Sequence, residues 1–265
     1  MALVPFPGAA VPAPDFDPEP EEDDRTAKMS FLEHLDELRR RLIWSVSALV
    51  GGFLICLLFI GPIKAFVMEP LVRVLPRGGT LIYTEPTEGF MLGMKMAALA
   101  GLFLAAPVIL WQLWKFIAPG LYAHEKKFAI PFVVFATFFF TAGALFSHYI
   151  AFPWAWEFFA SFSTEYMTFT PKVGSVFSLY VKMLLGFGAI FQMPTIVFFL
   201  ARVGGITARF LIKNIKYAIL IIFIIAAVLS PGTDVVSQAM MAGPMLVLYL
   251  ISIVIAWVFG KRKTV

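Results

Sequence analysis

A run of nineteen residues, from position 42 to position 60, contains no charged side chain, and five further apolar segments follow it. A helix needs about 20 consecutive apolar residues to cross the hydrocarbon core of a bilayer. The chain is 60% hydrophobic and only 14% charged, which leaves too little polar surface for a globular domain in water. The sequence therefore predicts an all-α polytopic membrane protein.

Six transmembrane helices with two longer connections, 61–90 and 149–175, are expected. The spans are predicted at residues 42–60, 91–113, 128–148, 176–201, 217–229 and 236–258. The fifth and sixth are expected to be short. The fifth would rise only about 20 Å, against a hydrocarbon core of about 30 Å. Either the bilayer is thinner around it or the helix packs against something else.

The first 28 residues differ from the rest of the chain. They hold six prolines within the first twenty positions and seven acids between Asp15 and Asp24. Such a segment cannot bury apolar area, and we expect it to be disordered and without a role in the fold. It has neither the basic and apolar regions of a secretory signal nor the acid-poor composition of a transit peptide. The predicted organisation is a tail at 1–28, a membrane domain at 29–260 and a basic tail at 261–265.

The distribution of positive charge predicts the orientation in the membrane. Six of the 21 lysines and arginines lie on one side of the predicted spans, at Lys64, Arg73, Arg77, Lys95, Lys172 and Lys182. The other 15 lie on the opposite side. Because cytoplasmic loops carry the excess of Lys and Arg, we expect the richer side, with both termini, to face the cytoplasm.

An amphipathic helix is predicted immediately before the first span. Ser30 and Glu33 form a capping box, and Glu37 precedes Arg41 by one helical turn. Apolar residues recur at helical spacing, at Phe31, Leu35, Leu38 and Leu42. One interpretation is a surface helix that lies on the membrane and carries weak ion pairs. The other is that a carboxylate, kept ionised by its arginine neighbours, receives a cation from the cytoplasm.

The connection between the second and third spans contains another acid. Pro119 and Gly120 predict a turn, and Glu125 falls near the start of the third helix. The helix dipole favours an anion there, which explains the residue without any functional role. Yet Glu37 and Glu125 are expected at the same depth on the same side. Two neighbouring carboxylates can bind two guanidinium groups bidentately.

Three segments resemble the TatC family, the receptor component of the twin-arginine protein translocase. They are residues 31–42 (FLEHLDELRRRL), residues 106–127 (APVILWQLWKFIAPGLYAHEKK) and the turn formed by Ser230–Pro231 with 234–238 (DVVSQ). The resemblance covers residues 30 to 260. It implies a six-span receptor that performs no bond chemistry and needs no cofactor.

The same resemblance implies where the Arg-Arg signal peptides of folded preproteins bind. Glu37 and Glu125 would hold the two arginines. The cytoplasmic site would be shaped by His34, Arg39, Phe116, Leu121 and Tyr122. Pro70, in the first outer loop, matches a functionally sensitive proline of the family. Asp234 belongs to the outer turn between the last two spans, where Ser230 and Gln238 would contact a partner subunit.

The family context also implies partners. These are single-span subunits of the TatA and TatB type, further copies of the chain within one complex, and the lipid bilayer, with no nucleic acid. Transport would take place across the bacterial cytoplasmic (inner) membrane and use its proton gradient.

A metal site is not expected, because His34, His124 and His148 are scattered, and Cys56 has no partner for a disulfide.

One position departs from the family pattern. Members commonly carry a glutamate within the fourth span, whereas this chain has Gln192 in the middle of a nineteen-residue uncharged run, 183–201. A polar residue at mid-bilayer is costly and is a functional candidate by default. Glutamine can hydrogen-bond a partner helix but cannot titrate. The alternative is a glutamine whose hydrogen bonds are satisfied within its own bundle.

Two other classes of function are weighed against a receptor. A secondary transporter or channel needs ionisable residues that converge at mid-membrane, whereas His148, Lys95 and Lys182 lie near the ends of the predicted spans. An intramembrane enzyme is disfavoured because His124 and Glu125 are not followed by the second histidine of a zinc motif. The sequence therefore favours a receptor.

Overall fold

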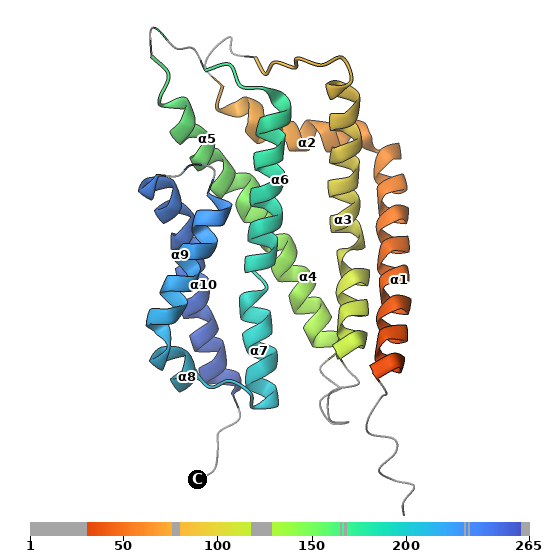
Figure 1. The fold of residues 1–265 in the computed structure, drawn as a ribbon, viewed down its shortest axis with the longest axis vertical. Helices are drawn as coiled ribbons and strands as arrows, with labels where there is room; N and C mark the ends of the chain where they lie inside the picture. The colour runs from red at the N-terminus through yellow and green to blue at the C-terminus, as the bar shows by residue number, and fades with distance from the viewer. Residues whose placement is uncertain are drawn as a thin grey trace, which may run out of the picture.

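The computed structural model describes residues 31–75, 80–117, 129–164, 166, 169–230, 232 and 234–260. Regular structure within these ranges is helical, apart from isolated bridge residues such as Ile82 and Lys172, which pair in parallel. Most helices run along one long axis, and α2 lies across one end of the bundle (Figure 1). The predicted all-α architecture is confirmed.

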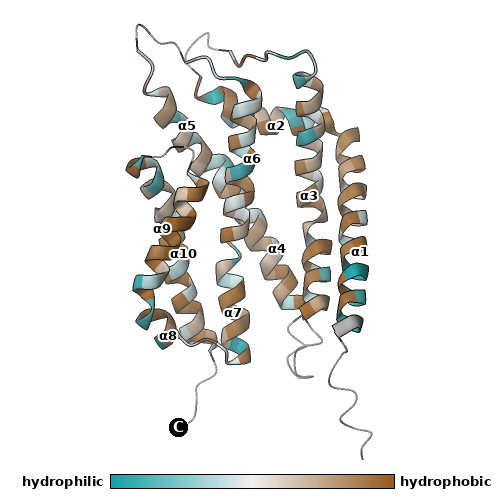
Figure 2. Ribbon diagram, in the orientation of Figure 1, coloured by the Kyte–Doolittle hydropathy of each residue, from teal (hydrophilic) through white to brown (hydrophobic). Residues whose placement is uncertain are grey.

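The elements follow one another as α1 (Phe31–Leu58), α2 (Ile60–Arg73), α3 (Glu88–Ile117), α4 (Ala129–Phe146), the π-helical turn η3 (Ser147–Ala151), α5 (Phe152–Ala160), α6 (Val173–Ile190), α7 (Met193–Val203), α8 (Ala208–Lys213), α9 (Ile215–Leu229) and α10 (Val235–Phe259). Five helical stretches are long and apolar enough to cross a membrane, and α9 is a shorter apolar helix. Hydrophobic residues dominate along their lengths (Figure 2). The prediction of six spans is confirmed.

The first span begins earlier than expected. Helix α1 runs without a break from Phe31 to Leu58, so the amphipathic segment continues directly into the membrane span. The expectation of a separate helix lying on the membrane surface is therefore wrong. The helix-favouring residues of the amphipathic segment are followed without a breaker by the apolar run, so one helix forms. Glu37 consequently stands on the same rigid element as the first span.

The third and fourth spans also differ from their predicted bounds. The third continues past residue 148, through the turn Ser147–Ala151, into α5. The fourth is two helices, α6 and α7, which are separated at Phe191 and Gln192. Pro194, in the first turn of α7, has no N–H to continue the hydrogen-bond ladder of α6.

The last two spans differ in length. Helix α9 has 15 residues and rises about 22 Å, which confirms a short fifth span. Helix α10 has 25 residues and is long enough to cross a membrane, so the expectation of a short sixth span is wrong. Its start is capped by Asp234, and the helix continues through Pro244 to Phe259.

Pro70 lies inside α2 and not in a loop, which corrects the expectation from the sequence. Its side chain is buried. The indole Nε1 of Trp156 donates a 3.2 Å hydrogen bond to the carbonyl oxygen of the next residue, Leu71. The first outer connection is thus partly a helix that is anchored to α5.

Two glycines bring the backbones of α1 and α3 together. A Cβ atom at Gly52 would lie 2.6 Å from the carbonyl oxygen of Gly101, and one at Gly101 would lie 2.5 Å from the backbone nitrogen of Phe53. Small residues at such crossings let membrane helices approach closely. The helices are antiparallel (Figure 1). Residues equally far from this crossing in opposite chain directions therefore lie at the same depth.

Candidate functional site

The glycine crossing sets which part of α3 faces Glu37. Glu37 lies fifteen residues before Gly52, and Phe116 lies fifteen residues after Gly101. At 1.5 Å per residue, both stand about 22 Å from the crossing, at the free ends of α1 and α3. The polar residues of the amphipathic motif are thus brought to the end of α3.

Glu37 forms an ion pair on its own helix. Its Oε1 accepts a 2.8 Å bond from Nη2 of Arg41. The Nη1 of the same guanidinium lies 3.5 Å from Oε1 of Gln112, a buried residue on α3. Arg41 therefore joins Glu37 to α3. Gln112 and Arg41 were not predicted as site residues, because only the tertiary fold shows that they meet.

The second carboxylate oxygen of Glu37 is the most informative atom of this site. Oε2 is buried and has no hydrogen-bond partner within the described part of the chain. The Nε atom of Arg41 is likewise buried and has no hydrogen-bond partner there. The Glu37 side chain as a whole is only 14% exposed. A buried acceptor without a partner is costly, so a donor that reaches this oxygen is favoured.

An aromatic contact lies beside the ion pair. The rings of His34 and Phe116 stack with centroids 4.4 Å apart and an angle of 22° between planes. His34 precedes Glu37 by nearly one turn, so these two side chains share a face of α1. The structure therefore brings together three of the predicted site residues: His34, Glu37 and Phe116.

The remaining predicted residues of this site are not part of that cluster. Arg39 is exposed, and two positions along a helix from Glu37 it faces another side. Leu121, Tyr122 and Glu125 lie outside the described residues. The described chain leaves α3 at Ile117 and re-enters at Ala129, and both positions lie at the same end of the bundle as the start of α1 (Figure 1).

Gln192 makes a hydrogen bond within its own bundle. Its Nε2 donates to the carbonyl oxygen of Ala136 on α4, at 2.9 Å. Gln192 stands at the break between α6 and α7, and its side-chain amide reaches a carbonyl on a neighbouring helix. This geometry favours the reading in which Gln192 is satisfied internally.

The polar residues of the turn between α9 and α10 mostly bond to one another. Ser230 is buried and donates to the carbonyl of Gly232, at 2.8 Å. Gln238 Nε2 donates to the carbonyl of Phe223 on α9, at 2.8 Å. Asp234 caps α10 by accepting the backbone N–H of Ser237, at 2.7 Å. That bond, helped by the hydroxyl of Ser237 and opposed by partial burial, holds the pKa of Asp234 below its ordinary value.

His148 was expected near the end of a span, and this is wrong. It lies in the π-helical turn inside the long stretch Ile130–Ala160 and is buried. Its Nδ1 is 2.9 Å from the hydroxyl of Tyr180, and its ring stacks on Phe66 with centroids 4.1 Å apart. No sequence signal predicts a π turn here.

Comparison with known proteins decides the family. A family model described as "Sec-independent protein translocase protein (TatC)" matches residues 33–244, which is more than half of the chain. The chain belongs to the TatC family. TatC members are translocase proteins and not enzymes, which removes the intramembrane-enzyme alternative.

Relatives match over most of their length. The chain is 39% identical over 240 residues to a "Sec-independent protein translocase protein TatC" of Koribacter versatilis (strain Ellin345), covering 89% of this chain and 88% of the relative. It is 44% identical over 223 residues to the protein of the same name from Helicobacter pylori (strain ATCC 700392 / 26695), covering 84% of this chain and 85% of the relative.

Solved structures of the family share the fold. A "Crystal Structure of Twin Arginine Translocase Receptor- TatC" superimposes with a TM-score of 0.72 at 37% identity, covering 84% of this chain and 98% of that chain. A second structure of that receptor, "in DDM", gives a TM-score of 0.74 at the same identity, covering 86% of this chain and 100% of that chain. This chain therefore has the same six-span fold as the solved TatC structures.

Proposed function

We propose that this TatC protein is the receptor subunit of a twin-arginine translocase. It binds the Arg-Arg signal peptides of folded preproteins at the free ends of α1 and α3. The observation that carries the proposal is the buried Oε2 of Glu37, which has no hydrogen-bond partner among the described residues. An arginine of the signal peptide satisfies this oxygen, while Arg41 remains paired with the other carboxylate oxygen, Oε1. Phe116 and His34 form the adjoining apolar wall.

The second arginine is assigned to Glu125. The loop that carries Glu125 connects Ile117 to Ala129, and both ends of that loop lie at the Glu37 end of the bundle (Figure 1). Leu121 and Tyr122 belong to the same loop and are assigned to the wall of the site. Arg39, which is exposed, is assigned to the rim of the site, where it contributes to the electrostatic field and does not contact Glu37.

The energetics require more than the two arginines. A charge-assisted hydrogen bond contributes about 1.5–3 kcal/mol, so two clamps supply on the order of 4–6 kcal/mol. Micromolar binding needs about 8 kcal/mol. The apolar part of the signal peptide supplies the difference by partitioning into the bilayer along α1 and α3, whose outer faces are apolar and exposed.

Mutation of the two acids tests this assignment. Glu37→Ala and Glu125→Ala should each abolish export of a strictly twin-arginine-dependent reporter and leave membrane insertion intact. Replacement by Asp keeps the charge but shortens the reach, and should give partial loss. Asp36→Ala is the matched control, because Asp36 is the exposed neighbour of Glu37 on the same helix. Normal export by both alanine variants would refute the assignment.

Crosslinking locates the bound peptide directly. A photoreactive residue in place of Glu125 should crosslink to a synthetic twin-arginine peptide, and a twin-lysine peptide should compete poorly. The same residue placed at Arg73, at the opposite end of the bundle, should not crosslink. A crosslink from Arg73 with none from Glu125 would place the peptide elsewhere.

We propose that the chain lies in the bacterial inner membrane, with both termini and Glu37 in the cytoplasm, as the distribution of Lys and Arg predicts. Several copies assemble with single-span subunits of the TatA and TatB type, and export uses the proton gradient. The short α9 and the half-buried Gln238 support docking near the α9–α10 turn. Because Ser230 is buried, we assign it the structural role of holding the conformation of that turn. Cysteine-accessibility labelling of positions 36 and 83 from each side of the membrane tests the orientation.

A further inference from the structure

Two cavities form one continuous groove between α3 and α6, in the half of the bundle that carries α2. The inner cavity has a volume of about 760 Å³ and is walled almost entirely by apolar side chains of α1, α3 and α6. The outer cavity, of about 340 Å³, is lined largely by polar and charged residues at the starts of α3 and α6. Lys95, Phe177 and Ser178 line both cavities, so the polar cavity opens into the apolar one.

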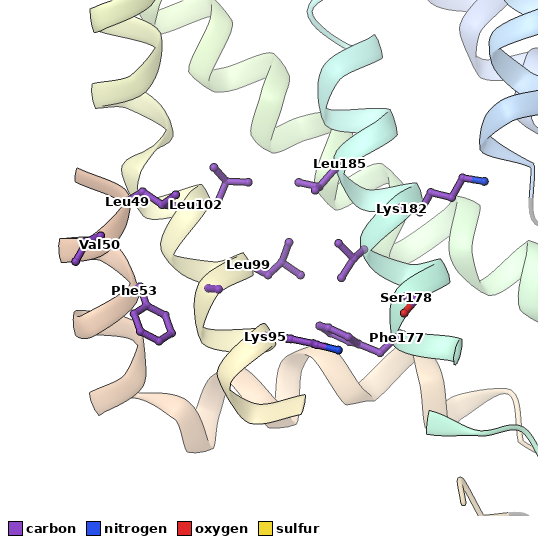
Figure 3. A pocket seen from close by; sticks show the side chains of 12 residues that line it. Leu49, Val50, Phe53, Lys95, Leu99, Leu102, Phe177, Ser178, Lys182 and Leu185 are labelled. Carbon is purple, nitrogen blue, oxygen red and sulfur yellow. The ribbon is translucent and has the colours of Figure 1, made fainter. Parts of the chain in front are cut away.

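Lys95 stands at the junction of the two cavities. Its side chain is exposed, and its ammonium extends from α3 toward α6 beside Phe177 (Figure 3). Lys182 also contributes to the wall, but its ammonium is directed away from α3 (Figure 3). A lysine within a membrane span is costly unless an anion or water meets its charge.

The other charges of the outer cavity are already engaged with one another. The carboxylate of Glu88 accepts the backbone N–H groups of Thr84 and Gly174, at 3.1 and 3.0 Å. Lys172 lies 3.9 Å from both Glu88 and Glu85. In the described part of the chain, no carboxylate comes within ion-pair distance of Lys95. Lys95 is therefore the cation that this groove offers to an anion.

The length of the groove identifies the kind of occupant. Along α3 the lining runs from Glu88 to Leu102, fifteen residues whose Cα atoms span about 21 Å. Half of a bilayer, headgroups included, is about 20–22 Å thick. A transmembrane helix of a partner would need a groove along the whole hydrocarbon core of about 30 Å. The groove is therefore as long as one leaflet, polar at its outer end and apolar at its inner end.

We propose that the groove binds one phospholipid of the leaflet on the α2 side. Its phosphate contacts the ammonium of Lys95, and an acyl chain lies along Leu99, Leu102 and Leu185. The bound lipid fills the space between α3 and α6 and supplies the anion for Lys95. This binding site is separate from the Glu37 site, so the two proposals fail independently.

Native mass spectrometry of the full chain in mild detergent tests the phosphate contact. The probes are phosphatidylglycerol and phosphatidylethanolamine, added separately. Lys95→Met should weaken retention of both lipids at least about 10-fold, because a charge-assisted contact is lost. Lys95→Arg should retain them. Lys64→Met, which removes an exposed lysine of α2 outside the groove, is the matched control and should bind as the unmodified chain does.

A second pair of measurements tests the acyl-chain position with Lys95 intact. Ala98→Trp places a large side chain in the inner cavity from an exposed position and should reduce lipid retention, with little effect on the melting temperature. A photoreactive residue at Leu102 should yield a lipid adduct in membranes. Unchanged retention by both Lys95→Met and Ala98→Trp would overturn the proposal. So would competition by inorganic phosphate alone, or a protein adduct at Leu102 without any lipid adduct.

Discussion

Replacing Gly101 with alanine should separate α1 from α3 and thereby disrupt the Glu37 site from about 22 Å away. The new Cβ would lie 2.5 Å from the nitrogen of Phe53 and 2.8 Å from the carbonyl carbon of Gly52. Non-bonded carbon atoms prefer about 3.5–4.0 Å, so the two backbones must move apart by about 1 Å. Overpacking of this kind costs about 1–3 kcal/mol.

The same displacement acts on the site itself. The contact between Arg41 and Gln112 is already 3.5 Å long, at the outer limit of a hydrogen bond. An additional separation of about 1 Å breaks it and removes the link that holds the Glu37 pair against α3. We therefore expect weaker binding of a twin-arginine peptide, although Gly101 contacts no part of the site.

Gly51→Ala is the matched control for this prediction. A Cβ at Gly51 meets no atom within 4 Å. Both substitutions gain helix propensity, by up to about 1 kcal/mol, so their difference isolates the packing term. The assays are thermal unfolding in detergent and the rate of disulfide formation between His34→Cys and Phe116→Cys in a Cys56→Ser background. Equal melting temperatures and equal disulfide rates for the two alanine variants would refute the reasoning.

Three further predictions concern single contacts. Trp156→Phe removes the hydrogen-bond donor to the carbonyl of Leu71 and should lower the free energy of unfolding by about 1–3 kcal/mol. Trp154 is exposed, so Trp154→Phe is the control and should not lower it; equal losses for the two variants would contradict this prediction. Gln192→Leu removes the hydrogen bond to the carbonyl of Ala136 and should cost about 0.6–1.7 kcal/mol in the same unfolding assay; an unchanged free energy of unfolding would show that this bond does not stabilise the bundle. The pKa of Asp234 is lower in the folded state than in the unfolded state, where it is about 4. The ionised carboxylate therefore stabilises the fold fully at pH values above the unfolded pKa, and this stabilisation is lost as the pH falls through the folded pKa. Asp234→Asn still caps α10, and its melting temperature should vary less between about pH 2 and pH 5 than that of the unmodified chain; identical profiles would argue against the shift.

Much of the fold was predictable because membrane spans are local features. The uncharged apolar runs predicted the number of spans, and the short fifth span was predicted from the small number of residues in its apolar run. The bounds failed where a break or a continuation depended on neighbouring helices. The split at Gln192 and the π turn at His148 are of this kind, since the Gln192 amide and the His148 ring each find a hydrogen-bond partner on another helix. Pro70 was misplaced because a helix outside the apolar runs has no strong periodic signal.

The sequence by itself determined the class of molecule, the positions of its apolar helices and the carboxylate of Glu37 as a candidate, because hydropathy and helix capping depend on residues close together in the chain. Only the tertiary structure decided what meets that carboxylate. The crossing at Gly52 and Gly101 places Phe116 and Gln112 beside α1, and the gap between α3 and α6 places Lys95 in an amphipathic groove. These pairings join residues tens of positions apart, and they depend on side-chain volume at helix contacts, which no local pattern encodes.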